Sequence, residues 1–270
     1  MDFTFGIITD FKNEPKLLNL ISSIENQNII NYQIILVGSM RDLKKHNLYE
    51  NKPKVTFIDF DETEKKGWIT KKKNLVTNAA KYENIVYLHD YLLLDSNWYS
   101  GFKRFGNNFD ICINKIYNSD GSRYRDWCLS PQNFKNIDSK LEDKLEYLLP
   151  YTEIGLSRYM YISGAYWVAK KNVMIQYPLN EDLSWGDGED IEWSHRVRKK
   201  HTFKLNQYSS VRLQKNKDVI MNEISKETLE LFKKQESNIY FQILDNGLAK
   251  IRRIIFLYTK KLKYLKNKLF

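Results

Sequence analysis

Carboxylate side chains gather in one short stretch of the chain, with six of them between residues 181 and 192. Two glycines and Trp185 interrupt this run. Neighbouring carboxylates raise each other's pKa, so such a cluster either solvates a loop or serves a ligand. Glycine permits backbone angles closed to other residues, and tryptophan offers a flat amphipathic surface. The stretch predicts a tight turn that presents Glu189 and Asp190 at a helix start, where a carboxylate takes a proton from a polar ligand.

A second group of chemically active residues is basic. Five lysines lie between residues 65 and 73, around Gly67 and directly before Asn74. Ammonium groups and backbone amides near a helix start can hold a diphosphate, so the segment predicts a phosphate cradle; a lysine-covered helix surface is the alternative. Asp90 follows an apolar run, where a carboxylate either holds a divalent cation between two phosphates or caps a turn.

Strand and helix patterns place these residues along one edge of a sheet. Apolar runs predict buried strands, and spacings of three and four predict helices. The strands are expected at 3–9, 33–39, 55–60 and 84–88, and the helices at about 16–26 and through residue 80. This order is typical of an α/β domain with a largely parallel sheet, which binds ligands at the carboxyl ends of its strands. Those ends carry Thr9, Gly38, Asp59, His89 and Asp90.

The second half of the chain repeats the alternation less regularly. The elements expected there are a helix near Trp98, a strand at 110–112, a substrate-facing loop at 118–131, a charged helix at 137–149, a strand at 158–169, a helix at 190–200 and a strand near Val211. Gly164 lies within the strand at 158–169, where a small residue permits a close approach to the backbone.

Composition favours one large α/β domain, alone or with an appendage. Cys112 and Cys128 have neither CxxC spacing nor a disulfide framework, which predicts free thiols in a reducing compartment. No early apolar segment follows a basic start, and no apolar run reaches the length of a membrane span. We therefore expect a cytoplasmic protein.

The basic charge is concentrated at the C-terminal end. Residues 248–270 carry eight basic side chains and no acid, which leaves +2 of the net charge of +10 for the preceding 247 residues. Apolar residues recur every three or four positions from Leu244 to Leu269 and predict an amphipathic helix. It would lie on the inner face of an anionic membrane, or pack against the body or a coiled-coil partner in a homo-oligomer. Nucleic acid is disfavoured because base-reading polar residues are few.

Taken in order, these motifs resemble a family-2-type glycosyltransferase of the GT-A fold over about residues 3–213. The resemblance rests on the strand ending at Thr9, the Gly67…Lys73-Asn74 segment, His89-Asp90-Tyr91, Gly164-Ala165, and Trp185-Gly-Asp-Gly-Glu-Asp190 before a helix. It implies a mixed, mainly parallel central sheet flanked by helices over residues 1–215. Within this domain, residues 1–98 would bind the nucleotide sugar and 99–215 the acceptor, and 216–270 would be a helical basic extension.

The resemblance also implies a reaction. A sugar would pass from a nucleotide-diphosphate sugar to a hydroxyl of a glycan or lipid-linked glycan, of the surface polysaccharide or lipopolysaccharide type, with inversion. Asp190 would be the general base, Glu189 would position the acceptor, and Trp185 would stack on a sugar. The remaining implied positions are Gly164 and Gly188 for the acceptor, and Thr9, Gly38, Asp59, Gly67, Lys73, Asn74, His89 and Asp90 for the donor.

One departure from the family's pattern concerns its metal. Asp90 stands alone between His89 and Tyr91, where the family has Asp-x-Asp for Mn²⁺ or Mg²⁺, and the late histidine that often completes the shell is replaced by Arg212 and Gln214. Asp90 could hold the metal weakly or with His89, or lysines could supply the charge. A non-catalytic nucleotide-sugar or glycan-binding module is therefore the second hypothesis. A nucleotidyltransferase is the third, and it has less use for a pair of acids at 189–190.

Overall fold

The computed structural model describes residues 1–39, 52–129, 147–153, 160–218 and 221–234. The chain divides into one unit of residues 1–223 and a second of residues 224–270. In the second unit, residues 226–234 form a helix, while the predicted amphipathic helix of the tail lies outside the described residues. No helix in the described ranges is long and apolar enough to cross a membrane.

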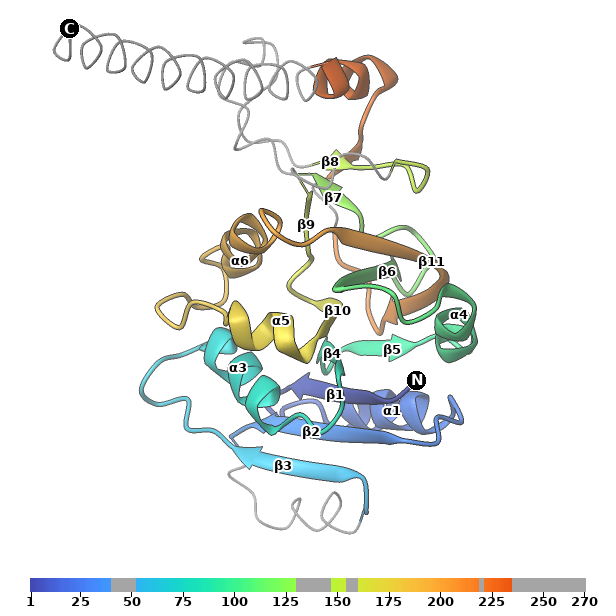
Figure 1. The fold of residues 1–270 in the computed structure, drawn as a ribbon. Coiled ribbons are helices and arrows are strands. Elements are labelled where there is room, and N and C mark those ends of the chain that lie inside the picture. Colours follow the sequence, from blue (N-terminus) through green and yellow to red (C-terminus); the bar gives the residue numbers. More distant parts are fainter. Residues whose placement is uncertain (40–51, 130–146, 154–159, 219–220, 235–270) are drawn as a thin grey trace, which may run out of the picture. The chain divides into compact units, whose positions relative to one another are not determined.

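An eight-stranded sheet organises the first unit, in the order β3-β2-β1-β4-β10-β6-β11-β5 (Figure 1). The strands are β1 (Phe3–Ile8), β2 (Tyr32–Gly38), β3 (Val55–Asp59), β4 (Asn84–His89), β5 (Leu92–Leu94), β6 (Ile111–Tyr117), β10 (Tyr166–Lys170) and β11 (Phe203–Leu213). The strands β1 to β4 are parallel to one another, and β11 is parallel to β6. The strand β10 runs antiparallel to both β4 and β6, and β5 runs antiparallel to β11. The predicted mixed, mainly parallel sheet is confirmed.

This topology brings the strand ends that carry the candidate site residues to one edge of the sheet, which we call the functional edge. Because β10 reverses direction between β4 and β6, both of these strands point the same way. The carboxyl ends of β1, β2, β3, β4, β6 and β11 therefore lie along the same edge as the amino end of β10. Ligands of α/β sheets bind at such an edge.

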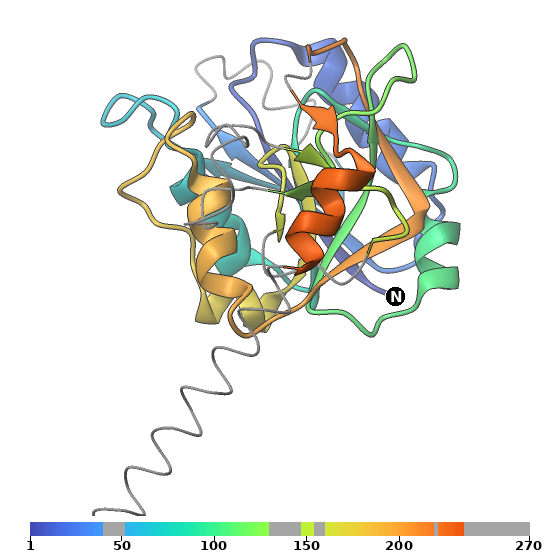
Figure 2. The same cartoon turned by 90° about the horizontal axis from the view of Figure 1, so that it is seen from above.

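Helices cover both faces of the sheet (Figure 2). They are α1 (Glu14–Glu25), α3 (Ile69–Ala79), α4 (Trp98–Phe105), α5 (Lys171–Gln176) and α6 (Glu189–Val197). Helix α1 begins where the Asn13 side chain accepts a hydrogen bond from the Lys16 amide at 3.3 Å. Its buried residues recur at helical spacing and join the core of Phe3, Phe5 and Ile7.

The two faces are packed differently. On one face, the Trp98 ring of α4 lies 5.0 Å from Phe3 and 5.4 Å from Phe5, between ring centroids. On the other, a Cβ at Gly6 would lie 2.1 Å from a methyl of Val76, so α3 sits close against β1. Such contact requires glycine, because packed cores leave no room for an added methyl. This approach fixes the position of α3 and its lysines over the sheet.

A smaller sheet adds four short strands in the order β12-β8-β7-β9. They are β7 (Cys128–Leu129), β8 (Tyr147–Leu148), β9 (Met160–Tyr161) and β12 (Asn222–Glu223). Up to residue 146, the expected helix at 137–149 lies outside the described residues. The end of that segment forms the strand β8 instead of a helix. Both residues of β8 are buried and pair with β7, which local helical spacing could not reveal. Cys112 and Cys128 are free and buried, as predicted.

Two expected strands differ in extent. The strand at 158–169 is interrupted, because a turn at Ser163, closed by the Tyr166 amide at 3.1 Å, separates β9 from β10. The strand expected near Val211 is longer, since β11 begins at Phe203 and contains an irregularity between Asn206 and Ser210. Polar side chains there bond inside the protein, as when the Ser209 hydroxyl donates to the Trp98 carbonyl at 2.7 Å. Their polarity hides the strand from a search for apolar runs.

Candidate functional site

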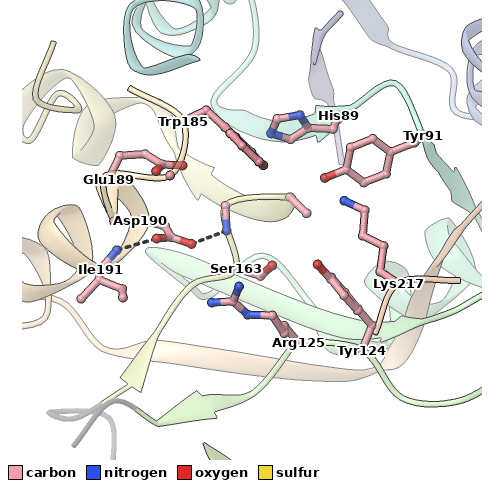
Figure 3. Close-up of a pocket in the computed structure, with 14 residues that line it drawn as sticks. His89, Tyr91, Tyr124, Arg125, Ser163, Trp185, Glu189, Asp190, Ile191 and Lys217 are labelled. Atoms are coloured by element: carbon pink, nitrogen blue, oxygen red, sulfur yellow. Dashed lines mark hydrogen bonds between the residues drawn. The ribbon is translucent and has the colours of Figure 1, made fainter. Parts of the chain in front are cut away.

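A pocket of about 320 Å³ opens at the functional edge of the sheet (Figure 3). Its size lies at the lower end of the range for small-molecule sites. We call the Gly164, Glu189 and Asp190 side the acid wall, and the Tyr91, Tyr124, Arg125 and Lys217 side the cation wall. The lining residues are His89, Tyr91, Tyr124, Arg125, Ser163, Gly164, Ala165, Trp185, Gly186, Gly188, Glu189, Asp190, Ile191 and Lys217.

Asp190 is held by backbone groups at the start of α6. One carboxylate oxygen accepts from the Gly164 amide at 2.8 Å and the other from the Ile191 amide at 2.9 Å. Gly188, at φ 73°, supplies the left-handed turn that opens the helix. Each carboxylate oxygen has two lone pairs, so the group retains acceptor capacity toward the pocket. A carboxylate fixed in this way is suited to receive a proton from a bound hydroxyl.

Glu189 and Lys73 are both buried at the acid wall, and their opposite charges act on each other's pKa. Glu189 is 6% exposed. Burial raises the pKa of its carboxyl, and the Lys73 ammonium opposes this shift. Burial likewise lowers the pKa of Lys73, and both acids oppose that shift. The Lys73 ammonium donates to the Gly164 carbonyl at 2.9 Å and lies 4.6 Å from the Trp167 ring centroid. The Gly164 peptide is therefore bonded at its carbonyl to Lys73 and at its amide to Asp190.

Gly164 leaves little room for a side chain. A Cβ there would lie 3.0 Å from the nearest Glu189 carboxylate oxygen and 3.1 Å from that of Asp190. The sequence predicted a close approach to this backbone, and the structure shows that the two acids make that approach. Glycine at this position lets both carboxylates stand against the strand end.

The lysine-rich segment contacts the loop of residues 179–188, which we call the acid loop, instead of lying exposed to solvent. The Trp185 amide donates to the Gly67 carbonyl at 2.9 Å, and the Trp68 indole donates to the Glu181 carbonyl at 2.7 Å. The Lys65 ammonium donates to the carbonyls of Glu181 and Asp182 at 3.0 and 2.7 Å. These bonds fix the loop that carries Trp185, whose side chain stays 73% exposed beside the pocket.

Asn74 of α3 also forms hydrogen bonds to the acid loop. Its amide group donates to the Leu179 carbonyl at 2.9 Å and to a Glu181 carboxylate oxygen at 3.0 Å, and its oxygen accepts from the Leu179 amide at 3.0 Å. Neither Lys73 nor Asn74 lines the pocket. Their predicted contacts with a donor stay predictions; the structure directs Asn74 to Leu179 and Glu181, and Lys73 to the Gly164 carbonyl.

Thr9, Gly38 and Asp90 meet at the neighbouring strand ends. The Thr9 hydroxyl donates to an Asp90 carboxylate oxygen at 2.7 Å, and burial raises the pKa of Asp90. A Cβ at Gly38 would lie 2.2 Å from the Thr9 carbonyl, so the close approach of β1 and β2 requires glycine. Asp59 pairs in register with Gly38 at the end of β3 and is exposed.

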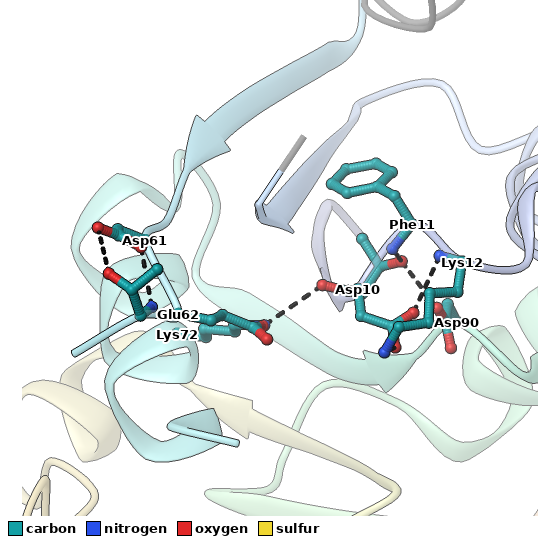
Figure 4. A network of polar contacts seen from close by, with 9 residues as sticks. Asp10, Phe11, Lys12, Asp61, Glu62, Lys72 and Asp90 are labelled. Carbon is teal, nitrogen blue, oxygen red and sulfur yellow. Dashed lines mark hydrogen bonds and ion pairs between the residues drawn. The ribbon is translucent and has the colours of Figure 1, made fainter. Parts of the chain in front are cut away.

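Lys72 lies beside Glu62 (Figure 4). Its buried ammonium pairs with Glu62 and donates to the Thr9 carbonyl at 3.3 Å. Burial lowers the pKa of Lys72 to about 8. This lysine neutralises Glu62 and stabilises the turn after β1.

The residues around Asp90 do not fit a divalent cation. His89 lines the pocket and stacks on Tyr91, with 5.3 Å between ring centroids, whereas Asp90 turns to Thr9. Gln214, near the position of the family's late histidine, donates to the Asp90 carbonyl at 3.4 Å. Among the described residues, no three His, Cys, Asp or Glu side chains gather into a metal-binding group. Mn²⁺ and Mg²⁺ prefer several oxygen ligands, whereas Asp90 accepts from Thr9 and the nearby Asp10 is paired with Lys12.

Lys217 is one of the pocket residues that the sequence did not single out. Its ammonium lies 3.6 Å from the Tyr91 ring centroid, and its backbone amide donates to the Asn118 side chain at 3.0 Å. Burial lowers its pKa to about 8, and the nearby charges of Lys215 and Arg125 add to this shift. The available signal was its place directly after a strand near Val211, at the edge where ligands bind.

Neither a family model nor a curated protein sequence matches this chain. The fold is similar to that of residues 1–349 of S. aureus TarS in complex with UDP, with a TM-score of 0.52 and 13% identity, over 79% of this chain and 61% of that one. It is also similar to GalNAc-T7 with UDP, GalNAc and Mn²⁺, with a TM-score of 0.56 and 13% identity, over 86% of this chain and 46% of that one. The chain spans less than two thirds of the length of either structure. These similarities show a GT-A-like fold, as the resemblance predicted.

Proposed function

We propose that this chain is a glycosyltransferase that moves a sugar from a nucleotide-diphosphate sugar to a hydroxyl of a glycan or lipid-linked glycan. The observation that carries the proposal is the pair of backbone hydrogen bonds that hold Asp190 at the pocket, beside buried Glu189. Orienting a carboxylate in advance is what a general base requires. The UDP of both similar structures supports a nucleotide sugar as the donor.

The reaction follows from the two walls of the pocket. The acceptor oxygen attacks the anomeric carbon and forms the new glycosidic bond, and its proton passes to the Asp190 carboxylate. The bond from the anomeric carbon to the diphosphate breaks, and the diphosphate leaves with the electron pair. Glu189 and Asp190 lie on one side of the pocket and Lys217 on the other (Figure 3). This arrangement suits an inverting displacement, in which the base and the leaving group act on opposite faces of the carbon. The proposed outcome is inversion.

The acceptor is proposed to be a sugar because Trp185 offers a largely exposed ring at the pocket. Sugar rings pack well against indole faces, since the C–H groups on one face of the sugar meet the flat, apolar face of the indole. A lipid-linked acceptor at a membrane surface is suggested by the basic amphipathic pattern of residues 248–270, read from the sequence. A non-catalytic module with the same fold is the second candidate, favoured by the single carboxylate at Asp90.

The proposal is tested by replacing Asp190 with asparagine. Transfer by Asp190→Asn is expected to fall about 10³-fold, because the amide cannot accept the proton, while affinity for a nucleoside diphosphate stays within about twofold. The measurements are sugar transfer with a panel of donors and acceptors, and calorimetric binding of UDP. Asp187→Asn is the matched control, since Asp187 accepts from the Ser184 amide at 2.8 Å and does not line the pocket.

Full transfer by Asp190→Asn would exclude it as the base. A wild-type protein that binds UDP but neither transfers nor hydrolyses any donor of the panel would favour the binding module.

A further inference from the structure

A departing diphosphate needs positive charge, and the pocket supplies it from the chain itself. Two negative phosphates are poor leaving groups until a cation neutralises the charge that develops on them. The surroundings of Asp90 do not fit a divalent cation, as described above. Burial lowers the pKa of the His89 imidazole, and the charges of three nearby lysines, Lys73, Lys217 and Lys72, add to this shift. The charge that the reaction requires is thus present as ammonium groups.

Only some of these cations face the pocket. Lys73 donates to the Gly164 carbonyl, and Lys72 pairs with Glu62 and the Thr9 carbonyl, so both are engaged within the fold. Among the described lysines and arginines, Lys217 and Arg125 line the pocket. Arg125 donates to the Tyr161 hydroxyl at 3.0 Å, which directs part of its guanidinium toward the smaller sheet. Lys217 is therefore the ammonium best placed to meet an anion.

The backbone around Lys217 is anchored from two directions. The Gln214 side chain donates to the carbonyls of Lys16 at 2.8 Å and Leu92 at 3.2 Å, which ties the start of the segment to α1 and β5. The Lys217 amide is bonded to Asn118, which follows β6. The Tyr91 ring contacts the ammonium by a cation–π interaction, which does not occupy all three of its N–H donors. An ammonium held in this way can donate to phosphate oxygens without reorganising the chain.

We propose that Lys217 binds the diphosphate of the donor and supplies the charge that a divalent cation would otherwise supply, so that donor binding does not require a metal. The proposal rests on the proposed function, because it assigns the diphosphate of that same donor. As the bond to the anomeric carbon breaks, the ammonium keeps its proton and donates a hydrogen bond to the oxygen on which negative charge accumulates. No co-reactant is required.

The test measures binding of UDP to the full chain by calorimetry, once with EDTA and once with Mn²⁺. We expect wild-type affinity to agree within about twofold between the two conditions, because the cation is covalently part of the chain. Lys217→Met should weaken UDP binding about tenfold or more, which corresponds to one charge-assisted hydrogen bond. Uridine, which lacks phosphates, should bind both proteins equally. Lys217→Arg should retain most of the affinity.

Lys215→Met is the matched control, since Lys215 is exposed two residues away and does not line the pocket. Thermal melting of each variant checks that it folds. Equal UDP binding by Lys217→Met and wild type would overturn the assignment of Lys217, and wild-type binding that appears only with Mn²⁺ would overturn metal independence. A wild-type protein that binds none of UDP, GDP, CDP or ADP in either condition would instead contradict the proposed function itself.

Discussion

The two walls of the pocket are built by different means. The acid wall is fixed by backbone amides and by Lys73, which is fully buried behind it. The cation wall consists of side chains on connecting segments, and Lys217 is held there by an aromatic ring. A base must point at one proton, whereas a cation opposite a diphosphate acts as a point charge with little directional demand. The difference shows that each wall is as rigid as its proposed task requires.

The contrast is sharpest between two lysines. Lys73 belongs to a motif that looks like a phosphate cradle in the sequence, yet its ammonium is buried and directed at the Gly164 carbonyl. Lys217 belongs to no motif, yet it lines the pocket. We therefore expect substitutions at the two positions to affect different properties of the protein.

The largest effect is expected for Lys73→Met. The change removes the positive charge that acts on buried Glu189 and the ammonium that donates to the Gly164 carbonyl. The free energy of unfolding should therefore fall by about 3 kcal/mol. Urea denaturation measures this free energy. Lys66→Met is the matched control, because Lys66 is exposed, and a change within about 0.5 kcal/mol is expected there. If Lys73→Met were fully stable and lost only UDP affinity, Lys73 would belong with the cation wall.

Lys73→Met should also shift a titration. The Lys73 ammonium lowers the pKa of Glu189 against the larger effect of burial, so its removal should raise that pKa further. The carboxyl would then take up its proton at a higher pH than in the wild type. Carbon-13 NMR of the labelled glutamate carboxyl measures the midpoint, and a midpoint that falls or stays unchanged would contradict the pairing.

Gly164→Ala should produce the next largest effect, and on catalysis instead of stability. The added methyl would stand about 3 Å from both carboxylates and displace them, which should lower the transfer rate by about 10- to 100-fold. UDP affinity should stay within about twofold, because the acid wall does not contact the diphosphate. Ser163→Ala, one residue earlier in the same turn, is the control. A variant that loses UDP affinity with its rate unchanged would reverse the assignment of the two walls.

Trp185→Ala should have the smallest effect of the three. Loss of a stacking surface should raise the acceptor KM by about five- to tenfold, with UDP affinity and thermal melting unchanged. Steady-state kinetics with varied acceptor measures the change, and Trp185→Phe should restore most of it. An unchanged acceptor KM would show that the exposed indole serves another surface.

The fold was largely predictable because its first strands are unbroken apolar runs. The runs at 3–9, 33–39, 55–60 and 84–88 became β1 to β4, since buried parallel strands need apolar residues on both faces. The strand β11 was underestimated because Asn206, Ser209 and Ser210 are satisfied by internal hydrogen bonds. Two-residue strands such as β8 were not predictable, since distant partners stabilise them.

The acid wall was also predictable, because Glu189, Asp190 and the glycines before them lie close together in the sequence. The direction of the lysines was not, because it depends on how α3 is rotated against β1, which the Gly6–Val76 contact fixes. Lys217 carried no local signal. Its position follows from β11 running parallel to β6, a pairing between distant segments.

The reversed strand β10 also has a consequence for how the chain folds as it is synthesised. The strand β4 pairs with β1 early, but its other edge stays open until β10 emerges. The Lys73–Gly164 bond joins residues 91 positions apart, and contacts of such sequence separation form slowly. An open apolar strand edge is prone to aggregation during this interval. We therefore expect the nascent chain to be most prone to aggregation between the release of β4 and that of β10. Its pocket can be complete only when the segment after β11 has left the ribosome.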